Sequence, residues 1–161
     1  MDNITMIAAV GKNLELGKNN QLIWPLKKDL NFFREQTMHK PIIMGMNTYQ
    51  SLPKLLPGRK HIVLTKQNPT LPKEVEIIHS TDELLKYIDE YKEEVMIIGG
   101  ASLYKQMLEY AKKLILTEID QEDKDADAFF PPFQKEEWIE ELLGEQEENG
   151  IKYQHKIYRK K

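Results

Sequence analysis

The chain has 161 residues, 40% of them hydrophobic, which is enough for one domain with a buried core. Its 23 Lys and Arg residues are mixed along the chain with 26 Asp and Glu residues, for a net charge of −3. This balance argues against binding to the phosphate backbone of a nucleic acid, which favours clustered basic residues. Cysteine is absent, so disulfides, thiolate metal sites and cysteine nucleophiles are excluded.

The N-terminus has an acid at Asp2 and only a short apolar run, which is unlike a secretory leader. No window approaches the roughly 18 apolar residues of a membrane span. We therefore expect a cytoplasmic protein with one domain over residues 1–161, with no nucleic acid partner, no membrane partner and no metal site.

Short apolar runs rich in β-branched residues predict the strands of the core. Each has four to seven residues and is bounded by Gly, Pro, Asn or charged residues, a pattern that suits strands better than helices. They cover residues 4–10, 41–45, 61–65, 75–78, 95–99 and 113–119.

Helical patterns lie between several of these runs. We expect one helix to begin near Pro25, a second to cover 80–91 with a Ser80–Glu83 capping box, and a third to cover 101–111. Strands that alternate with helices predict an α/β domain with a largely parallel sheet.

The C-terminal part departs from this alternation. The Asn149-Gly150 pair separates two strand-like segments, 138–144 and 151–158, and is typical of a hairpin turn. We expect an antiparallel pair there that closes one edge of the sheet. The acidic segment 121–128 is expected to be a solvated loop.

Two strand-to-helix junctions and one turn could hold a ligand, although each has a simpler structural explanation. Gly99-Gly100, between a strand and a helix, could approach a phosphate or merely form a tight turn, and it lacks the GxGxxG pattern. Asn47 and Thr48 could meet an anion or cap a helix. Arg59 could capture a carboxylate or be a solvated turn residue.

The stretch LIWPLKKDLNFF carries one acid, Asp29, among bulky apolar residues. Helical spacing puts Leu26, Leu30, Phe33 and Thr37 on one face, with Asp29 at its margin. An acid in the first turn can simply stabilise the helix dipole. Its apolar neighbours also fit a carboxylate that lines a pocket.

The motifs IAAV, LGKNNQLIW, PIIMG, NTYQSL, LPGRKHIVLT, IIGGASLY, LTEID and DAFFP follow one another in an order that resembles the dihydrofolate reductase family over essentially the whole chain. The resemblance implies an eight-stranded, mostly parallel central sheet with an antiparallel C-terminal edge and about four flanking helices. It also implies a monomer that reduces 7,8-dihydrofolate with NADPH, supports one-carbon and thymidylate metabolism, and binds antifolates.

The resemblance also implies a set of site residues. Asp29 would grip the pterin N3 and 2-amino groups, supported by Thr117, and Leu16 to Trp24 would close over the nicotinamide, with Trp24 in the catalytic set. Arg59 would bind the substrate's α-carboxylate. The pocket wall would comprise Ile7, Ala8, Leu30, Phe33, Leu52 and Ile98. The cofactor site would comprise Ala9, Leu16, Gly17, Gly45, Asn47, Thr48, Leu64, Thr65, Lys66, Gly99, Gly100, Ala101, Ser102, Leu103 and Tyr104.

Several positions depart from the family pattern. Ile23 replaces the usual Pro before Trp24, and Met46 and Ser102 stand where basic residues are common, which weakens the expected grip on the NADPH 2′-phosphate unless Lys66 compensates. Asp127 matches the Asp of the family's Gly-Asp-Thr loop only loosely, which puts the hydrogen bonds that latch the mobile loop in doubt. Two alternatives remain open: a reductase of riboflavin synthesis, and a non-catalytic nucleotide-binding or interaction module on the same fold.

Overall fold

In the computed structural model, which describes residues 2–161, the six apolar runs of the sequence form strands. Three of these strands have the predicted bounds, and the other three are shorter by one residue. The strands are β1 (Ile4–Val10), β4 (Ile42–Gly45), β5 (His61–Leu64), β6 (Glu76–Ile78), β7 (Val95–Gly99) and β8 (Lys113–Ile119).

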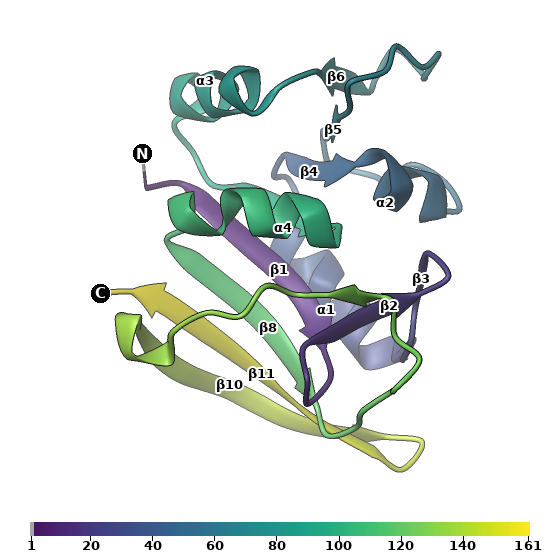
Figure 1. Cartoon of the computed structure of the whole chain (residues 1–161), viewed down its shortest axis with the longest axis vertical. Coiled ribbons are helices and arrows are strands. Elements are labelled where there is room, and N and C mark those ends of the chain that lie inside the picture. Colours follow the sequence, from purple (N-terminus) through teal and green to yellow (C-terminus); the bar gives the residue numbers. More distant parts are fainter. Residues whose placement is uncertain (1) are drawn as a thin grey trace.

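Within residues 2–161 these strands join two more in an eight-stranded sheet of order β10-β11-β8-β1-β7-β4-β5-β6 (Figure 1). Along this spatial order, every pair of adjacent strands from β8 through β1, β7, β4 and β5 to β6 is parallel. In contrast, β11 (Ile151–Lys160) is antiparallel to both β8 and β10 (Trp138–Glu148). The turn between β10 and β11 is Asn149-Gly150, and both residues have positive φ, 53° and 79°. The predicted sheet and its antiparallel edge are confirmed.

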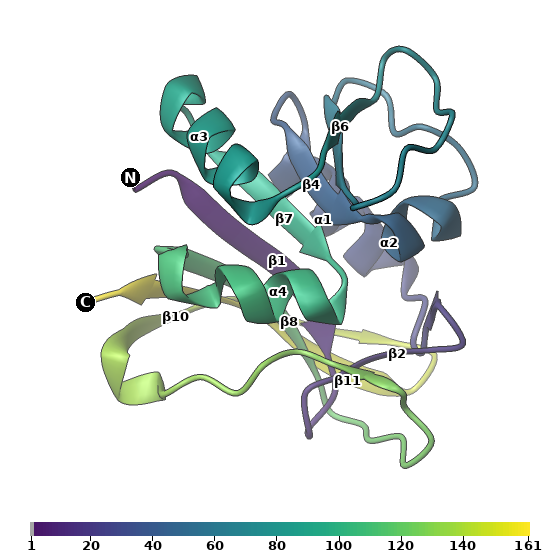
Figure 2. The ribbon, with the colours of Figure 1, turned by 45° about the horizontal axis from the view of Figure 1, so that its top comes forward.

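Four α-helices of the described chain cover the two faces of this sheet (Figure 2). Side chains of α1 (Lys27–Thr37) and α2 (Met46–Ser51) pack on one face, with Ile7, Ile42 and Met44. Side chains of α3 (Thr81–Tyr91) and α4 (Ala101–Met107) pack on the other face, and a 3₁₀ turn, η1 (Leu108–Tyr110), extends α4. The apolar cores therefore lie between the sheet and each helix pair.

The helix termini confirm one capping prediction and correct another. Ser80 Oγ accepts the N–H of Glu83 at 3.1 Å, as the capping box predicts for α3. The N-cap of α2 is Gly45, without a side-chain cap, so the expectation that Asn47 or Thr48 caps this helix was wrong. Both lie inside the helix, after its N-cap.

The start of α1 is stabilised by a residue far away in the sequence. The helix begins at Lys27, two residues after Pro25, and its N-cap Leu26 offers no polar side chain. Instead, the Glu148 carboxylate accepts the N–H groups of Lys27 at 2.7 Å and Lys28 at 3.0 Å. The end of the C-terminal hairpin thus caps the helix that carries Asp29.

A second, three-stranded sheet of order β3-β2-β9 lies beside the main one. It comprises β2 (Glu15–Lys18), β3 (Gln21–Leu22) and β9 (Ala128–Phe129). The solvated-loop expectation for 121–128 was incomplete, because the end of that segment pairs with β2. A further 3₁₀ turn, η2 (Lys135–Glu137), precedes β10. Across residues 2–161, none of the helices has both the length and the apolarity needed to cross a membrane.

Candidate active site

The carboxyl ends of four parallel strands lie at one edge of the sheet (Figure 1). This edge collects Ala9, Gly45, Thr65 and Gly99, at or just after the ends of β1, β4, β5 and β7. Ligands of open α/β sheets bind outside this edge. The structure therefore brings the predicted cofactor residues of four separate motifs to one place.

Asp29 projects from the first turn of α1 toward β8 and β11. Its Oδ1 accepts a hydrogen bond from Thr117 Oγ1 at 2.5 Å and lies 3.1 Å from His155 Nε2. The Asp29 side chain is 14% exposed, so the carboxylate is largely withdrawn from water yet reachable. Thr117 is buried, which fixes the direction of its hydroxyl. The predicted pairing of Asp29 with Thr117 is present.

The predicted pocket wall is only partly assembled on one face. Ile7, Phe33, Leu52 and Ile98 share one apolar cluster on the α1 side of the sheet. Ala8 packs against the cluster on the opposite face, because neighbouring residues of a strand point to opposite sides. Leu30 is 49% exposed. Leu30 therefore exposes apolar surface in the same helical turn as the largely buried Asp29.

Arg59 is held by its own turn. Its Nε donates to the Pro57 carbonyl at 3.0 Å and its Nη1 donates to Thr37 Oγ1 at 3.2 Å. The buried His61 braces this turn, since Nε2 accepts the Leu56 N–H and Nδ1 donates to the Arg59 carbonyl, both at 3.0 Å. Desolvation lowers the pKa of His61, which keeps the imidazole neutral as this pattern requires.

A second guanidinium lies near Arg59. Burial lowers the pKa of Arg59, and the positive charge of Arg34 lowers it further. Two neighbouring guanidiniums repel each other until an anion binds between them. Arg34 was not among the predicted site residues, although its place one turn after Leu30 on the same helix face is a signal that could have indicated it.

The Gly99-Gly100 segment is closely approached by Thr48. The peptide between the two glycines is cis, and Gly99 has φ of 131°. A Cβ at either glycine would lie 3.2 Å from Thr48 Oγ1, which is tighter than an ordinary contact, and the positive φ of Gly99 also disfavours any other residue there. Gly100 is the N-cap of α4 and provides no side chain to its first N–H groups. The segment offers backbone polar groups and a hydroxyl to a ligand.

The side chains of Leu103 and Tyr104 face the core rather than the carboxyl ends of the strands. Both are 3% exposed, and the Tyr104 hydroxyl donates to the Ile7 carbonyl. Burial raises the pKa of Tyr104 far above its usual range. Their side chains anchor α4 and β1, so only their backbones remain for a ligand.

At the end of β5, Leu64 pairs with Ile78 of β6, and Thr65 and the exposed Lys66 follow. His79 Nδ1 donates to the Thr65 carbonyl at 2.9 Å. His79 was not among the predicted residues, because only the pairing of β5 with β6 brings it here. Ser102 is exposed and its hydroxyl accepts from Gln106, while Met46 packs against the α1-side cluster.

The segment from Leu16 to Trp24 is tied to two other parts of the chain, around Asp127 and at Asn47. Asp127 Oδ2 accepts the Asn19 N–H at 2.9 Å, and the Asp127 N–H donates to the Gly17 carbonyl at 3.0 Å. Asn20 Nδ2 donates to the Asn47 carbonyl at 3.0 Å. The doubt about the latch, raised by the loose match around Asp127, is resolved: the hydrogen bonds are present.

A family model described as "Dihydrofolate reductase" matches residues 3–160. The chain belongs to the dihydrofolate reductase family. It is 44% identical over 133 residues to the dihydrofolate reductase of Buchnera aphidicola subsp. Acyrthosiphon pisum, an alignment that covers 81% of this chain and 80% of the relative. It is 40% identical over 136 residues to that of Haemophilus influenzae, covering 83% and 82%. It is 37% identical over 137 residues to a "Dihydrofolate reductase type 3" of Salmonella typhimurium, covering 85% and 83%.

Membership of the dihydrofolate reductase family makes the protein an oxidoreductase, as the ordered motifs predicted. It also weighs against the riboflavin-pathway alternative, which shares only the fold. The geometry adds His155 at Asp29, Arg34 beside Arg59 and His79 at Thr65 to the residues that the resemblance implied.

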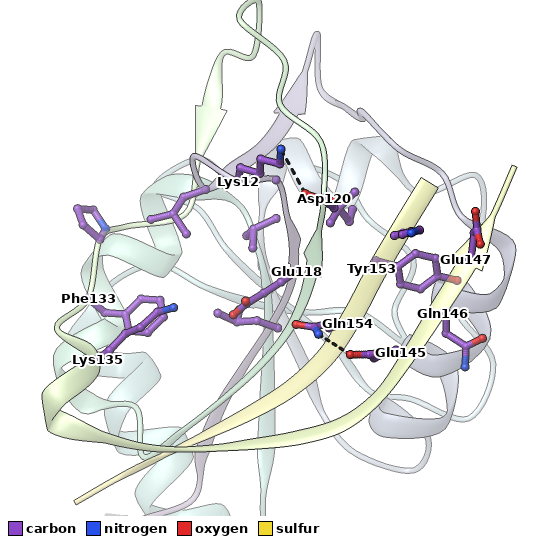
Figure 3. Close-up of a pocket in the computed structure, with 17 residues that line it drawn as sticks. Lys12, Glu118, Asp120, Phe133, Lys135, Glu145, Gln146, Glu147, Tyr153 and Gln154 are labelled. Atoms are coloured by element: carbon purple, nitrogen blue, oxygen red, sulfur yellow. Dashed lines mark hydrogen bonds and ion pairs between the residues drawn. The ribbon is translucent and has the colours of Figure 1, made fainter. Parts of the chain in front are cut away.

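This dihydrofolate reductase family member also has a pocket of about 950 Å³, lined by residues of β8, β10 and β11 among others (Figure 3). Its lining includes Leu116 and Glu118, which alternate along β8 with Thr117 and so face away from Asp29. Charges of both signs surround it, among them Lys12, Lys135 and Glu145. Asp29, Thr117 and His155 do not line this pocket. Among residues 2–161, no group of three or more His, Cys, Asp or Glu side chains could hold a metal ion.

Proposed function

We propose that the protein reduces 7,8-dihydrofolate to 5,6,7,8-tetrahydrofolate with a hydride from NADPH, and so supports one-carbon and thymidylate metabolism. The observation that carries this proposal is the largely buried Asp29 carboxylate, fixed by Thr117 beside an apolar wall and near the ligand-binding edge of the sheet. A carboxylate in this setting suits the two neighbouring N–H donors of a pterin ring.

Asp29 would bind and orient the ring rather than supply the proton itself. Within residues 2–161 both of its hydrogen bonds end on Oδ1, which leaves Oδ2 for the N3 and 2-amino groups of the pterin. The reacting C6 and N5 atoms lie at the far edge of the ring. A group fixed at N3 cannot reach N5 directly, so the N5 proton would arrive through a water molecule.

NADPH, when bound, supplies the hydride for C6. The residues at the strand ends fit such a cofactor, since Thr48 and the two glycines form a cradle that a Cβ would fill. Thr65, Lys66 and His79 lie together at the next strand end, where the adenosine phosphate would bind. The latched segment from Leu16 to Trp24 would exclude water from the nicotinamide.

The test follows nicotinamide oxidation with dihydrofolate for the native chain and for Asp29→Asn, with NADPH and NADH in parallel. We expect turnover by the native chain, a preference for NADPH, and a loss of about a hundredfold or more in kcat/KM for Asp29→Asn. No dihydrofolate-dependent oxidation by the native chain would overturn the proposal and favour a riboflavin-pathway reductase or a non-catalytic module. An unimpaired Asn variant would overturn the role given to Asp29.

A further inference from the structure

Strand register places three side chains in a row beneath the first turn of α1. Ala9 of β1 pairs with Thr117 of β8, and Thr117 pairs with His155 of β11. Residues paired across neighbouring strands point to the same face of a sheet, so the row faces one side. Asp29 of α1 lies over it and contacts both Thr117 and His155.

The His155 ring has little freedom to move. It stacks on Phe32 of α1 with the ring centroids 3.8 Å apart and the planes 8° from parallel. It also packs edge to face against Tyr153, with the ring centroids 5.6 Å apart and the planes at 71°. The residue is 6% exposed. Packing on two sides therefore aims Nε2 at Asp29 Oδ1, 3.1 Å away.

A carboxylate only accepts hydrogen bonds, so the Nε2 atom of His155 must carry the proton of this contact. The Thr117 hydroxyl and the His155 imidazole then both donate to Oδ1. We propose that His155 is a positioning residue for Asp29: with Thr117 it holds Oδ1 and so turns Oδ2 toward the bound pterin. This inference rests on the proposed function.

Two titratable groups lie near this pair: Tyr153 of β11 contacts the His155 ring, and Glu148 at the end of β10 contacts Tyr153. The residue of β1 in the same row is Ala9, which is not titratable. Burial, with the charges of Glu148 and Asp29, raises the pKa of Tyr153 to about 12, so this phenol stays neutral at physiological pH. Lys156 alternates with His155 along β11 and pairs with Glu118 and Glu140.

Two substitutions separate the role of the His155 N–H donor from the role of its ring packing. His155→Phe keeps an aromatic ring on Phe32 but removes the N–H, whereas His155→Gln removes the ring but keeps an N–H near the same place. We expect His155→Phe to lower kcat/KM for dihydrofolate about tenfold. It should also move the midpoint of the pH profile of kcat/KM to higher pH, because losing a donor favours the protonated carboxyl.

We expect His155→Gln to keep most of the activity and the native pH midpoint. The matched control is Gln154→Ala, one residue away on the opposite face of β11. It should leave kcat/KM and the pH midpoint unchanged. The Tm of each variant without ligand checks that it is folded. A His155→Phe variant with native kcat/KM and a native pH midpoint would overturn the inference, as would a Gln variant as impaired as the Phe variant.

Failure of the proposed function is distinguishable from failure of this inference. If the native chain does not turn over dihydrofolate, the same variants are compared by their affinity for a 2,4-diaminopteridine, whose donor edge needs the same carboxylate oxygen. Binding about tenfold weaker in His155→Phe and near native in His155→Gln would support the positioning role. Equal affinity of the native chain and His155→Phe would overturn it.

Discussion

Asp29 and Arg59 show how the role of one side chain depends on the neighbours that the fold brings to it. In the sequence, Asp29 is an acid at the margin of an apolar helix face, which fits a helix-dipole role as well as a binding role. In the structure its carboxylate is hydrogen-bonded to Thr117 of β8 and His155 of β11. Arg59 changes from a turn residue to one of two neighbouring guanidiniums.

Arg59→Ala should raise the KM for dihydrofolate about tenfold to a hundredfold while kcat changes little. The physical reason is the loss of the charge-assisted hydrogen bond that we propose Arg59 makes to the substrate carboxylate, worth about 1.5–3 kcal/mol. Steady-state kinetics on Arg59→Ala and Arg59→Lys measure it, and Lys should fall between Ala and the native chain. Arg159→Ala, which removes an exposed guanidinium paired with Glu141, is the matched control. A native KM in Arg59→Ala would refute the assignment.

At the scale of elements, the strands were easier to predict than the contacts between them. The six core strands follow from short apolar runs, and the C-terminal hairpin follows from Asn149-Gly150. The sheet of β2, β3 and β9 escaped prediction because two of its strands have only two residues. Segments of two residues are too short to show a hydrophobic periodicity, so only their pairing with distant parts of the chain defines them.

The latch between Asp127 and Asn19 gives a prediction about this small sheet. Asp127→Ala should speed hydrogen exchange at the Asn19 amide and lower kcat/KM about threefold to tenfold, because the segment from Leu16 to Trp24 loses an anchoring acceptor. Exchange monitored by NMR and steady-state kinetics measure the two effects. Asp125→Ala is the control, since that exposed residue lies in the same loop and its hydrogen bond is to Asp123 rather than to Asn19. Equal exchange at Asn19 in both variants would contradict the latch.

At the scale of the molecule, an ion cluster joins the amino ends of four strands, opposite the candidate site. Glu94, just before β7, accepts from Thr5 of β1 at 2.5 Å, from Lys40 just before β4 at 2.8 Å, and from Lys113 of β8 at 2.9 Å. Burial tends to raise the pKa of Glu94, but hydrogen bonds from Lys40, Thr5 and Lys113 outweigh it and lower the pKa to about 2.

This cluster predicts how stability depends on pH. A carboxyl whose pKa falls from 4.5 to about 2 on folding stabilises the native state above pH 4.5, and the contribution is lost as pH falls toward 2. At about 1.36 kcal/mol per pH unit, it is worth about 3 kcal/mol at most. Glu94→Gln should therefore destabilise the protein clearly at pH 7 and much less at pH 3.

Urea unfolding at pH 7 and pH 3 measures this difference, with kinetics as a second readout. The exposed neighbour variant Glu93→Gln should have little effect on stability at either pH. Activity of Glu94→Gln should stay near native, because the cluster lies at the opposite edge of the sheet. The same loss of stability at both pH values would show that the charge of Glu94 does not provide the stabilisation.

Residues close together in the chain were enough to predict the core strands, the capping of α3, the C-terminal turn and the family resemblance. Each depends on residues a few positions apart, or on the order of short motifs. Only the tertiary structure brought His155 to Asp29, Glu148 to the start of α1, and Asp127 to Asn19. These pairs are 126, 121 and 108 positions apart, so strand register and loop packing, rather than local chemistry, decide whether their atoms meet.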